Sequence, residues 1–197
     1  MKNGVTSSNT KRALAESLKK AMQTKPLAKI TVSELISDCG VNRKTFYYHF
    51  EDIYALLKWM LEQEAVEVVK SFDLMVDSEE ALEFVIDYVD ANKHILNCAY
   101  DFMGREGMKH FFNADFTGIV RSIVDSVANE LGLAVEESFK CFLTAFYAEA
   151  LAGMLINYFQ GSEAYNRQQL IDDTLFILHH SIPNILLEKS RGQRAGR

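Results

Sequence analysis

Proline is scarce in this chain of 197 residues, with Pro26 and Pro183 as the two examples. Because proline removes a backbone donor and breaks helix interiors, its scarcity permits long, uninterrupted helices. The alternation of apolar and polar residues that marks a half-buried strand is also missing. Hydrophobic residues make up 48% of the chain, which is enough to build a full core. These features predict an all-α globular protein.

Cysteine is also scarce, and the three residues Cys39, Cys98 and Cys141 are far apart in the sequence. This spacing excludes a paired zinc motif and a disulfide framework, and it fits a reducing, cytoplasmic location. No apolar run follows the N-terminal charge, so we expect no signal peptide. Glycine-rich phosphate loops and nucleophile elbows are missing, and the adjacent His179 and His180 point apart on a helix. We therefore expect no enzyme activity, no cofactor and no metal.

The stretch from Thr31 to Phe50 has the form of two short helices joined by a turn. Thr31 and Glu34 make a capping box at the start of the first helix, and Gly40 ends it. Asn42 is a good N-cap for a second helix, Arg43 to His49. A glycine-containing turn between two such helices predicts a helix-turn-helix.

The second of these helices separates an inner face from an outer one. Phe46 and Phe50 are four residues apart and share the inner face. Arginine and lysine can bind guanine, and hydroxyl and imidazole groups suit phosphate oxygens. Thr31 would meet a phosphate at a helix N-terminus. The candidate DNA-binding residues are Thr31, Asn42, Arg43, Lys44, Thr45, Tyr47, Tyr48 and His49. For Tyr48, a place in the core is an open alternative.

The string Gly40-Val41-Asn42-Arg43 followed by Thr45 to Phe50 resembles the recognition helix of TetR-type transcriptional regulators. The match covers roughly residues 9–57, and within the family it is most similar to the branch related to dihydroxyacetone-kinase regulators. The resemblance implies a ligand-responsive regulator, by default a repressor. Family members often carry a lysine just after the motif, where this chain has Glu51, Asp52 and Ile53. Either DNA binding is weaker, or other basic residues (Lys11, Arg12 and Lys44) replace that lysine.

The charge is distributed unevenly along the chain. The net charge is −6, but residues 1–50 hold nine lysines and arginines against three acids. A basic head on an acidic remainder confines attraction for phosphates to one end. We therefore assign residues 1–50 to a three-helix DNA-binding domain, and residues 51–197 to a larger helical domain for effector binding and dimerisation.

Helical periodicity continues through the larger domain. We expect a connecting helix over residues 52–72, followed by helices over 77–90, 94–101, 108–132, 136–160 and 167–188. Residues 1–8 and 191–197 are polar and are expected to lack regular structure. The aromatic residues of this domain suggest an apolar pocket with a few polar groups. The candidate ligand-binding residues are Tyr88, His94, Tyr100, Phe112, Phe116 and Tyr147, with ordinary core packing as the alternative for each.

The segment from Cys141 to Phe159 is almost continuously apolar, as a membrane span would be. Glu149 and Asn157 interrupt it and basic flanks are missing, which favours a buried helix at a subunit interface. The last helix would complete a four-helix contact between two chains. We expect no membrane insertion.

Together these features predict a homodimeric DNA-binding regulator that recognises a palindromic operator in double-stranded DNA and is controlled by an unknown small-molecule effector. An alternative is a regulator-derived interaction protein, which would bind a partner protein and contact DNA only weakly or only in that complex.

Overall fold

The computed structural model describes residues 2–73, 77–161 and 166–195, and no strand occurs among them. Two compact units divide the chain. The N-terminal unit comprises residues 1–68 and 92–104, and the C-terminal unit comprises residues 69–91 and 105–197. The expected all-α fold is confirmed. The proposed domain boundary after residue 50 stays a prediction.

The N-terminal unit begins with α1 (Lys2–Met22), which is followed by the short 3-10 helix η1 (Leu27–Lys29). The expectation that residues 1–8 lack regular structure is wrong, because α1 already starts at Lys2. Once a helix has formed, each added residue gains a backbone hydrogen bond, so it extends readily into a polar segment. The helix ends before Pro26, as expected.

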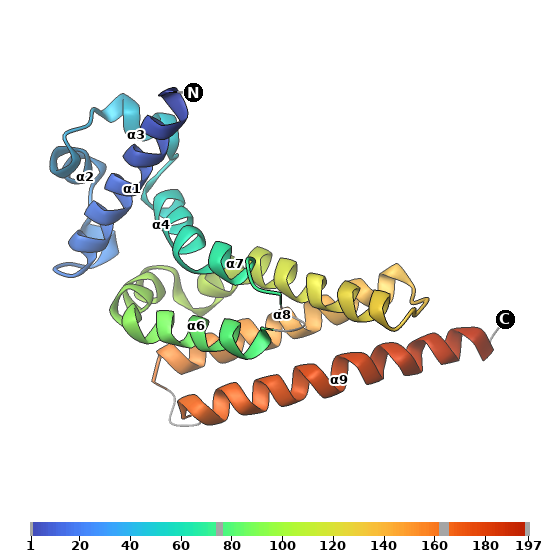
Figure 1. Cartoon of the computed structure of the whole chain (residues 1–197). Helices are drawn as coiled ribbons and strands as arrows, with labels where there is room; N and C mark the ends of the chain where they lie inside the picture. The colour runs from blue at the N-terminus through green and yellow to red at the C-terminus, as the bar shows by residue number, and fades with distance from the viewer. Residues whose placement is uncertain (1, 74–76, 162–165, 196–197) are drawn as a thin grey trace. The chain divides into compact units, whose positions relative to one another are not determined.

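Three further helices complete the head: α2 (Val32–Cys39), α3 (Arg43–His49) and α4 (Ile53–Leu61), as Figure 1 shows. Aliphatic and aromatic side chains from all of them are buried together with those of α1. The fully or nearly fully buried members are Leu14, Leu18, Met22, Leu35, Phe46, Leu56, Leu57 and Met60. Helix α4 contributes four buried residues in all.

The helix expected over residues 52–72 is observed as a contiguous helical run over residues 53–69 that contains a π-helical turn. After α4 come a π-helical turn, η2 (Glu62–Val66), and a short α5 (Glu67–Val69). Glu67 donates its backbone N–H to the carbonyl oxygen of Glu62, which is the wider hydrogen-bond step of a π-helix. Such turns are frequent at functional sites in helices.

The C-terminal unit contains α6 (Ser78–Ala91), α8 (Glu137–Phe159), α9 (Arg167–Ala195) and the greater part of α7 (Lys93–Glu130). Gly104 interrupts α7 with φ 68°, a left-handed conformation that favours glycine, so the expected break before Met108 is confirmed. Pro183 lies inside α9 without ending it. The tail from Arg191 was expected to be irregular and instead continues α9 to Ala195.

Helices α7, α8 and α9 share the core of this unit (Figure 1). Its buried residues are Val120, Val124, Val127, Ala128, Leu143, Tyr147, Ala148, Ile182 and Leu186. Among the described helices, α8 alone is long and apolar enough to cross a membrane, and a core helix passes the same test of length and composition.

Shortening a core leucine of this unit should destabilise the fold. Leu186 is fully buried, so Leu186→Ala should lower the free energy of unfolding by about 2–5 kcal/mol. The same change at Leu131, which is 51% exposed, should cost far less. Urea denaturation of both variants measures the difference, and equal losses would contradict this assignment of the core.

Candidate nucleic-acid interface

The turn between α2 and α3 is built by local hydrogen bonds. The Thr31 hydroxyl accepts from the backbone N–H of Glu34 at 3.3 Å and caps the start of α2. Gly40 ends α2 with φ 65°, and its N–H is directed to the last carbonyls of the helix. The N–H of Val41 then bonds to the carbonyl oxygen of Ile36 at 3.0 Å. These bonds set the direction in which the chain enters α3.

Asn42 starts α3 with two hydrogen bonds to one oxygen. Its Oδ1 accepts from the backbone N–H of Thr45 at 2.8 Å and from the Thr45 hydroxyl at 3.0 Å. The side-chain oxygen of Asn42 and the Thr45 hydroxyl therefore stabilise the start of the helix. Any contact of Asn42 with DNA would come from its amide nitrogen.

The outer face of α3 is exposed, as expected. Phe46 is fully buried and its ring lies 6.0 Å from that of the buried Phe50. Tyr47 is 49% exposed and Tyr48 is 81% exposed, so Tyr48 does not belong to the core. Arg43 and Lys44 are exposed as well. The helix thus presents cationic and phenolic groups over an apolar base.

Arg43 is held in place by contacts on both sides. Its guanidinium donates to the Ser33 hydroxyl of α2 and to the Tyr47 hydroxyl, each at 3.4 Å, and lies 5.7 Å from the centre of the Tyr47 ring. Such contacts reduce the freedom that a long side chain loses on binding. Ser33 was missing from the predicted site. Its position in the first turn of α2, two residues after the Thr31 cap, was the available signal.

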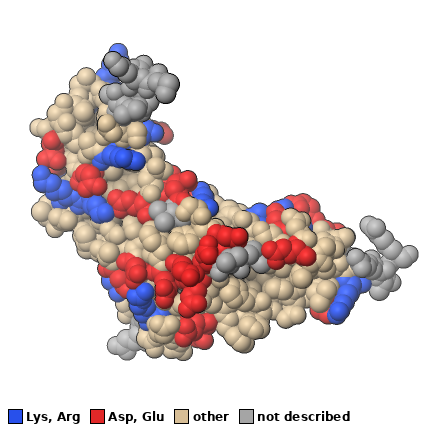
Figure 2. Space-filling view, in the orientation of Figure 1, with Lys and Arg blue, Asp and Glu red and all other residues tan. Residues whose placement is uncertain are grey.

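Ion pairs neutralise part of the basic head. Lys20 pairs with Asp38 at 3.1 Å and Lys19 pairs with Glu64 at 2.9 Å, while Lys25 pairs with Glu34. Hydrogen bonds from Lys20 and Ser17 lower the pKa of Asp38, and the bond from Lys25 lowers that of Glu34. Figure 2 shows basic and acidic side chains interspersed on one face of this unit. The net positive charge of residues 1–50 therefore overstates the positive charge that is available to attract phosphates.

Lys11 contacts two aromatic rings, so it is not placed to substitute for the lysine that is missing after the motif. Its ammonium lies 5.7 Å from the centre of the Phe50 ring and 5.6 Å from that of Trp59. This cation–π arrangement joins α1 to the residues around α4. Arg12 and Lys44 are exposed and remain the better replacements for that lysine.

His49 is half-buried at the end of α3. Loss of hydration and the nearby charge of Lys11 lower its pKa. Its ring lies 4.9 Å from that of Tyr48. The imidazole is therefore held in its neutral form until the pH falls below the usual range for histidine.

The six candidate ligand-binding residues are divided between the two units. His94 and Tyr100 belong to the N-terminal unit, whereas Tyr88, Phe112, Phe116 and Tyr147 belong to the C-terminal unit. The rings of Phe112 and Phe116 are 6.0 Å apart. Tyr147 is buried in the core, and its hydroxyl lies 2.5 Å from that of Ser181. A role in ligand binding stays a prediction for all six.

No family model matches the chain. The "HTH-type dhaKLM operon transcriptional activator DhaS" of Lactococcus lactis subsp. lactis (strain IL1403) is 22% identical over 179 residues, which cover 90% of this chain and 89% of that protein. A solved structure, "Dihydroxyacetone kinase operon activator DhaS", aligns with a TM-score of 0.61 at 19% identity, over 92% of this chain and 96% of that one. The chain is therefore similar to DhaS transcription regulators over nearly its whole length, which supports the resemblance to TetR-type regulators.

The similarity extends well beyond the helix-turn-helix. Both alignments cover at least nine-tenths of the chain, so they include the helices after α4 as well as the DNA-binding motif. The relatives are regulators rather than enzymes. Among the residues that the structure describes, no group of histidine, cysteine and acidic side chains is arranged to hold a metal ion.

Removing the cap of α3 should destabilise the head. Asn42→Ala deletes the oxygen that accepts from Thr45, and it should cost about 0.5–2 kcal/mol. Asn42→Asp keeps an accepting oxygen and should retain most of that stability. Hydrogen exchange of the α3 amides measures the effect. Equal protection in the wild type and Asn42→Ala would show that the cap contributes nothing.

Proposed function

We propose that this protein binds a palindromic DNA operator as a homodimer and that a small-molecule effector controls its affinity. The observation that supports this proposal is the outer face of α3, where Arg43, Lys44, Tyr47 and Tyr48 are exposed while Phe46 anchors the helix. A short helix seated in this way suits the major groove. The free cysteines among the described residues fit the reducing cytoplasm in which such a regulator would work.

The dimer contact that we propose uses exposed aromatic residues of α8 and α9. Phe142 and Phe146 are four residues apart on α8 and are 65% and 59% exposed. Phe176 of α9 is 64% exposed and the adjacent Ile177 is 49% exposed. Contiguous exposed apolar groups mark interaction surfaces, and we propose that these four residues form one such surface. Two such helix pairs would bury them in a four-helix contact.

Other apolar residues of α9 pack in the core of the unit itself. Ile182 and Leu186 are fully buried in the unit's own core, and Leu178 packs against that core. A charge at Leu178 would disturb the fold of one chain before it tested the dimer. The phenylalanines are therefore the better positions for testing association.

The direction of control depends on where the operator lies relative to the promoter. Repression is the default action implied by the TetR resemblance, whereas both compared relatives are named as activators. DNA binding by α3 is common to both modes. A promoter fusion with and without the protein measures the sign.

Effector control requires a ligand that binds one conformation better than another, because a ligand with equal affinity for both shifts nothing. The chain that leaves α3 passes directly through α4, η2 and α5 into the C-terminal unit. A π-helical turn within this connection is a place where the helix can change its hydrogen bonding. We propose this connection as the element that carries the change.

Truncating the outer face of α3 should weaken operator binding. Arg43→Ala should reduce affinity by about tenfold or more, since one base or phosphate contact of this kind is worth about 1–3 kcal/mol. Tyr47→Ala should weaken binding by a smaller factor. Arg191→Ala, an exposed position of α9, is the matched control. Fluorescence anisotropy on an operator selected from a random DNA library measures all three.

A salt titration of the wild type distinguishes the proposal from partner-dependent binding. Direct contact with phosphates predicts affinity that falls steeply as the salt concentration rises. If the purified protein does not bind DNA at low salt, the interaction-protein alternative is favoured. If Arg43→Ala and Tyr47→Ala both bind as the wild type does, α3 is not the reading helix.

Charged residues at the proposed dimer contact should separate the subunits. Phe146→Glu and Phe176→Glu place a carboxylate in a desolvated interface and should give monomers in sedimentation velocity. Phe102→Glu changes a 53% exposed phenylalanine of the N-terminal unit and should leave the dimer intact. Circular dichroism verifies that each variant is folded. Folded variants that still dimerise would exclude this surface.

DNA binding should strengthen as the pH falls from about 8 to about 6. The pKa of His49 is lowered in the free protein, and a nearby phosphate would raise it again. Binding would then take up a proton, and affinity rises as the pH drops through this range. His49→Gln should remove the dependence. A pH profile that is the same in the variant and the wild type would place His49 away from the phosphates.

A further inference from the structure

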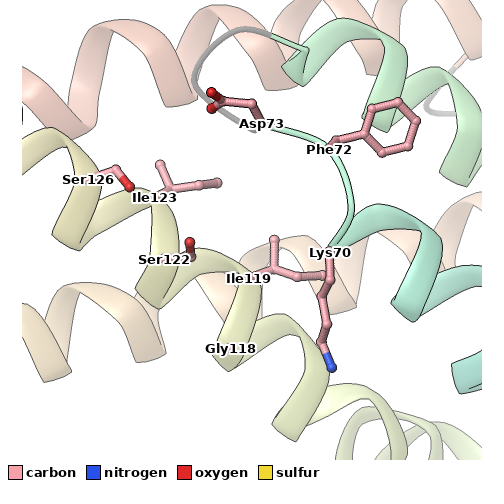
Figure 3. Close-up of a pocket in the computed structure, with 8 residues that line it drawn as sticks. All are labelled: Lys70, Phe72, Asp73, Gly118, Ile119, Ser122, Ile123 and Ser126. Atoms are coloured by element: carbon pink, nitrogen blue, oxygen red, sulfur yellow. The ribbon is translucent and has the colours of Figure 1, made fainter.

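A small cavity in the C-terminal unit lies between α7 and the segment that follows α5. Its volume is about 260 Å³, and it is lined by Lys70, Phe72, Asp73, Gly118, Ile119, Ser122, Ile123 and Ser126. Figure 3 shows the α7 residues along its floor and the segment from Lys70 to Asp73 as its opposite wall. None of the candidate ligand-binding residues suggested by the sequence lines it.

The wall opposite α7 is held by contacts within the same unit. The Phe72 ring lies 6.3 Å from that of Phe84 in α6. The carbonyl oxygen of Asp73 accepts from the N–H of Asp77 at 2.6 Å, and the Asp73 N–H donates to an Asp77 carboxylate oxygen at 3.3 Å. These bonds fix the backbone on both sides of the Asp73 carboxylate. Both walls of the cavity are therefore held in place, one by helix α7 and the other by these contacts.

Gly118 contributes space to the floor of the cavity. Glycine is unfavourable within a helix, and a methyl group at Gly118 would meet no atom within 4 Å. Close packing against a neighbour therefore does not explain why position 118 has no side chain. Its absence leaves the helix surface open beside Ile119, where a ligand can approach the backbone.

The polar groups of the cavity are arranged along its length. In Figure 3 the Lys70 ammonium lies at the Gly118 end, and the Asp73 carboxylate lies toward Ile123 and Ser126. Ser122 lies between them, and half-buried isoleucines supply the apolar floor. Gly118 and Ser126 are about 12 Å apart along the helix, from a rise of about 1.5 Å per residue. The lining therefore has opposite charges at the two ends of an apolar strip.

The size of the cavity limits what it can hold. Pockets for drug-sized ligands run from about 300 to 1,000 Å³, so a small metabolite fits better. We infer that this cavity binds a short linear aliphatic zwitterion, whose carboxylate meets Lys70, whose ammonium meets Asp73 and whose chain lies on Ile119 and Ile123.

This inference rests on the proposed ligand control and gives it a site. The wall from Lys70 to Asp73 is the direct chain continuation of α4, η2 and α5. A ligand that draws this wall toward α7 would favour one arrangement of the connection to α3. The site itself stands on the geometry of one unit and is tested without DNA.

The experiment is isothermal titration of the full chain with three probes of equal chain length. The probes are 6-aminohexanoate, hexanoate and hexylamine. The zwitterion should bind at least about tenfold more tightly than either singly charged probe, as expected for one additional charge-assisted hydrogen bond. Lys70→Met should reduce binding of 6-aminohexanoate to the level of hexylamine, and Asp73→Asn should reduce it to the level of hexanoate.

Filling the cavity supplies a second test. Gly118→Leu should abolish binding of 6-aminohexanoate, whereas Asn113→Leu, at an exposed position of the same helix, should leave it unchanged. Undetectable binding of 6-aminohexanoate, equal affinity for the three probes, or binding that survives in Gly118→Leu would overturn the inference. Operator affinity without probe should be the same in Gly118→Leu and the wild type. Loss of DNA binding by the wild type itself would instead count against the proposed function.

Discussion

The burial of Phe46 is the interaction on which the exposed surface of α3, the proposed DNA contact, depends. Helix α3 has seven residues, and isolated helices shorter than about 12–15 residues are marginal in water. It exists because Phe46 is fully buried in the head and because Asn42 satisfies the first turn. Because this side of α3 is buried, the opposite side faces solvent. The exposure of Tyr47 and Tyr48 is therefore a consequence of where Phe46 packs.

The same packing organises the charges of the head. Three lysines of the first twenty-five residues pair with acids on α2 or η2, and Lys11 lies against two aromatic rings. These contacts hold α1 against its neighbours and remove positive charge from the surface. Exposed cations outside these contacts include Arg43 and Lys44 on α3, and Arg12 and Lys29 elsewhere on the head.

Helices α8 and α9 of the C-terminal unit have apolar residues on two sides. One side of α8 and α9 fills the unit's own core through residues such as Tyr147, Ile182 and Leu186, and another side exposes phenylalanines. This explains why α8 is apolar enough to resemble a membrane span, since both of its sides carry apolar residues. The cavity over Gly118 lies on α7, on a separate surface of the same unit. Association and ligand binding can therefore be tested by separate substitutions.

The sequence by itself determined the helical class, the helix-turn-helix and its caps, because each cap is a hydrogen bond between residues at most a few positions apart. Thr31, Gly40 and Asn42 act as their spacing predicted. Only the tertiary structure decided which lysines are neutralised, where the helix after α3 takes a π-helical turn, and that the aromatic residues expected to line one pocket are divided between two units. Those outcomes depend on contacts between residues far apart in the chain, and helical periodicity shows that a side is apolar without showing what covers it.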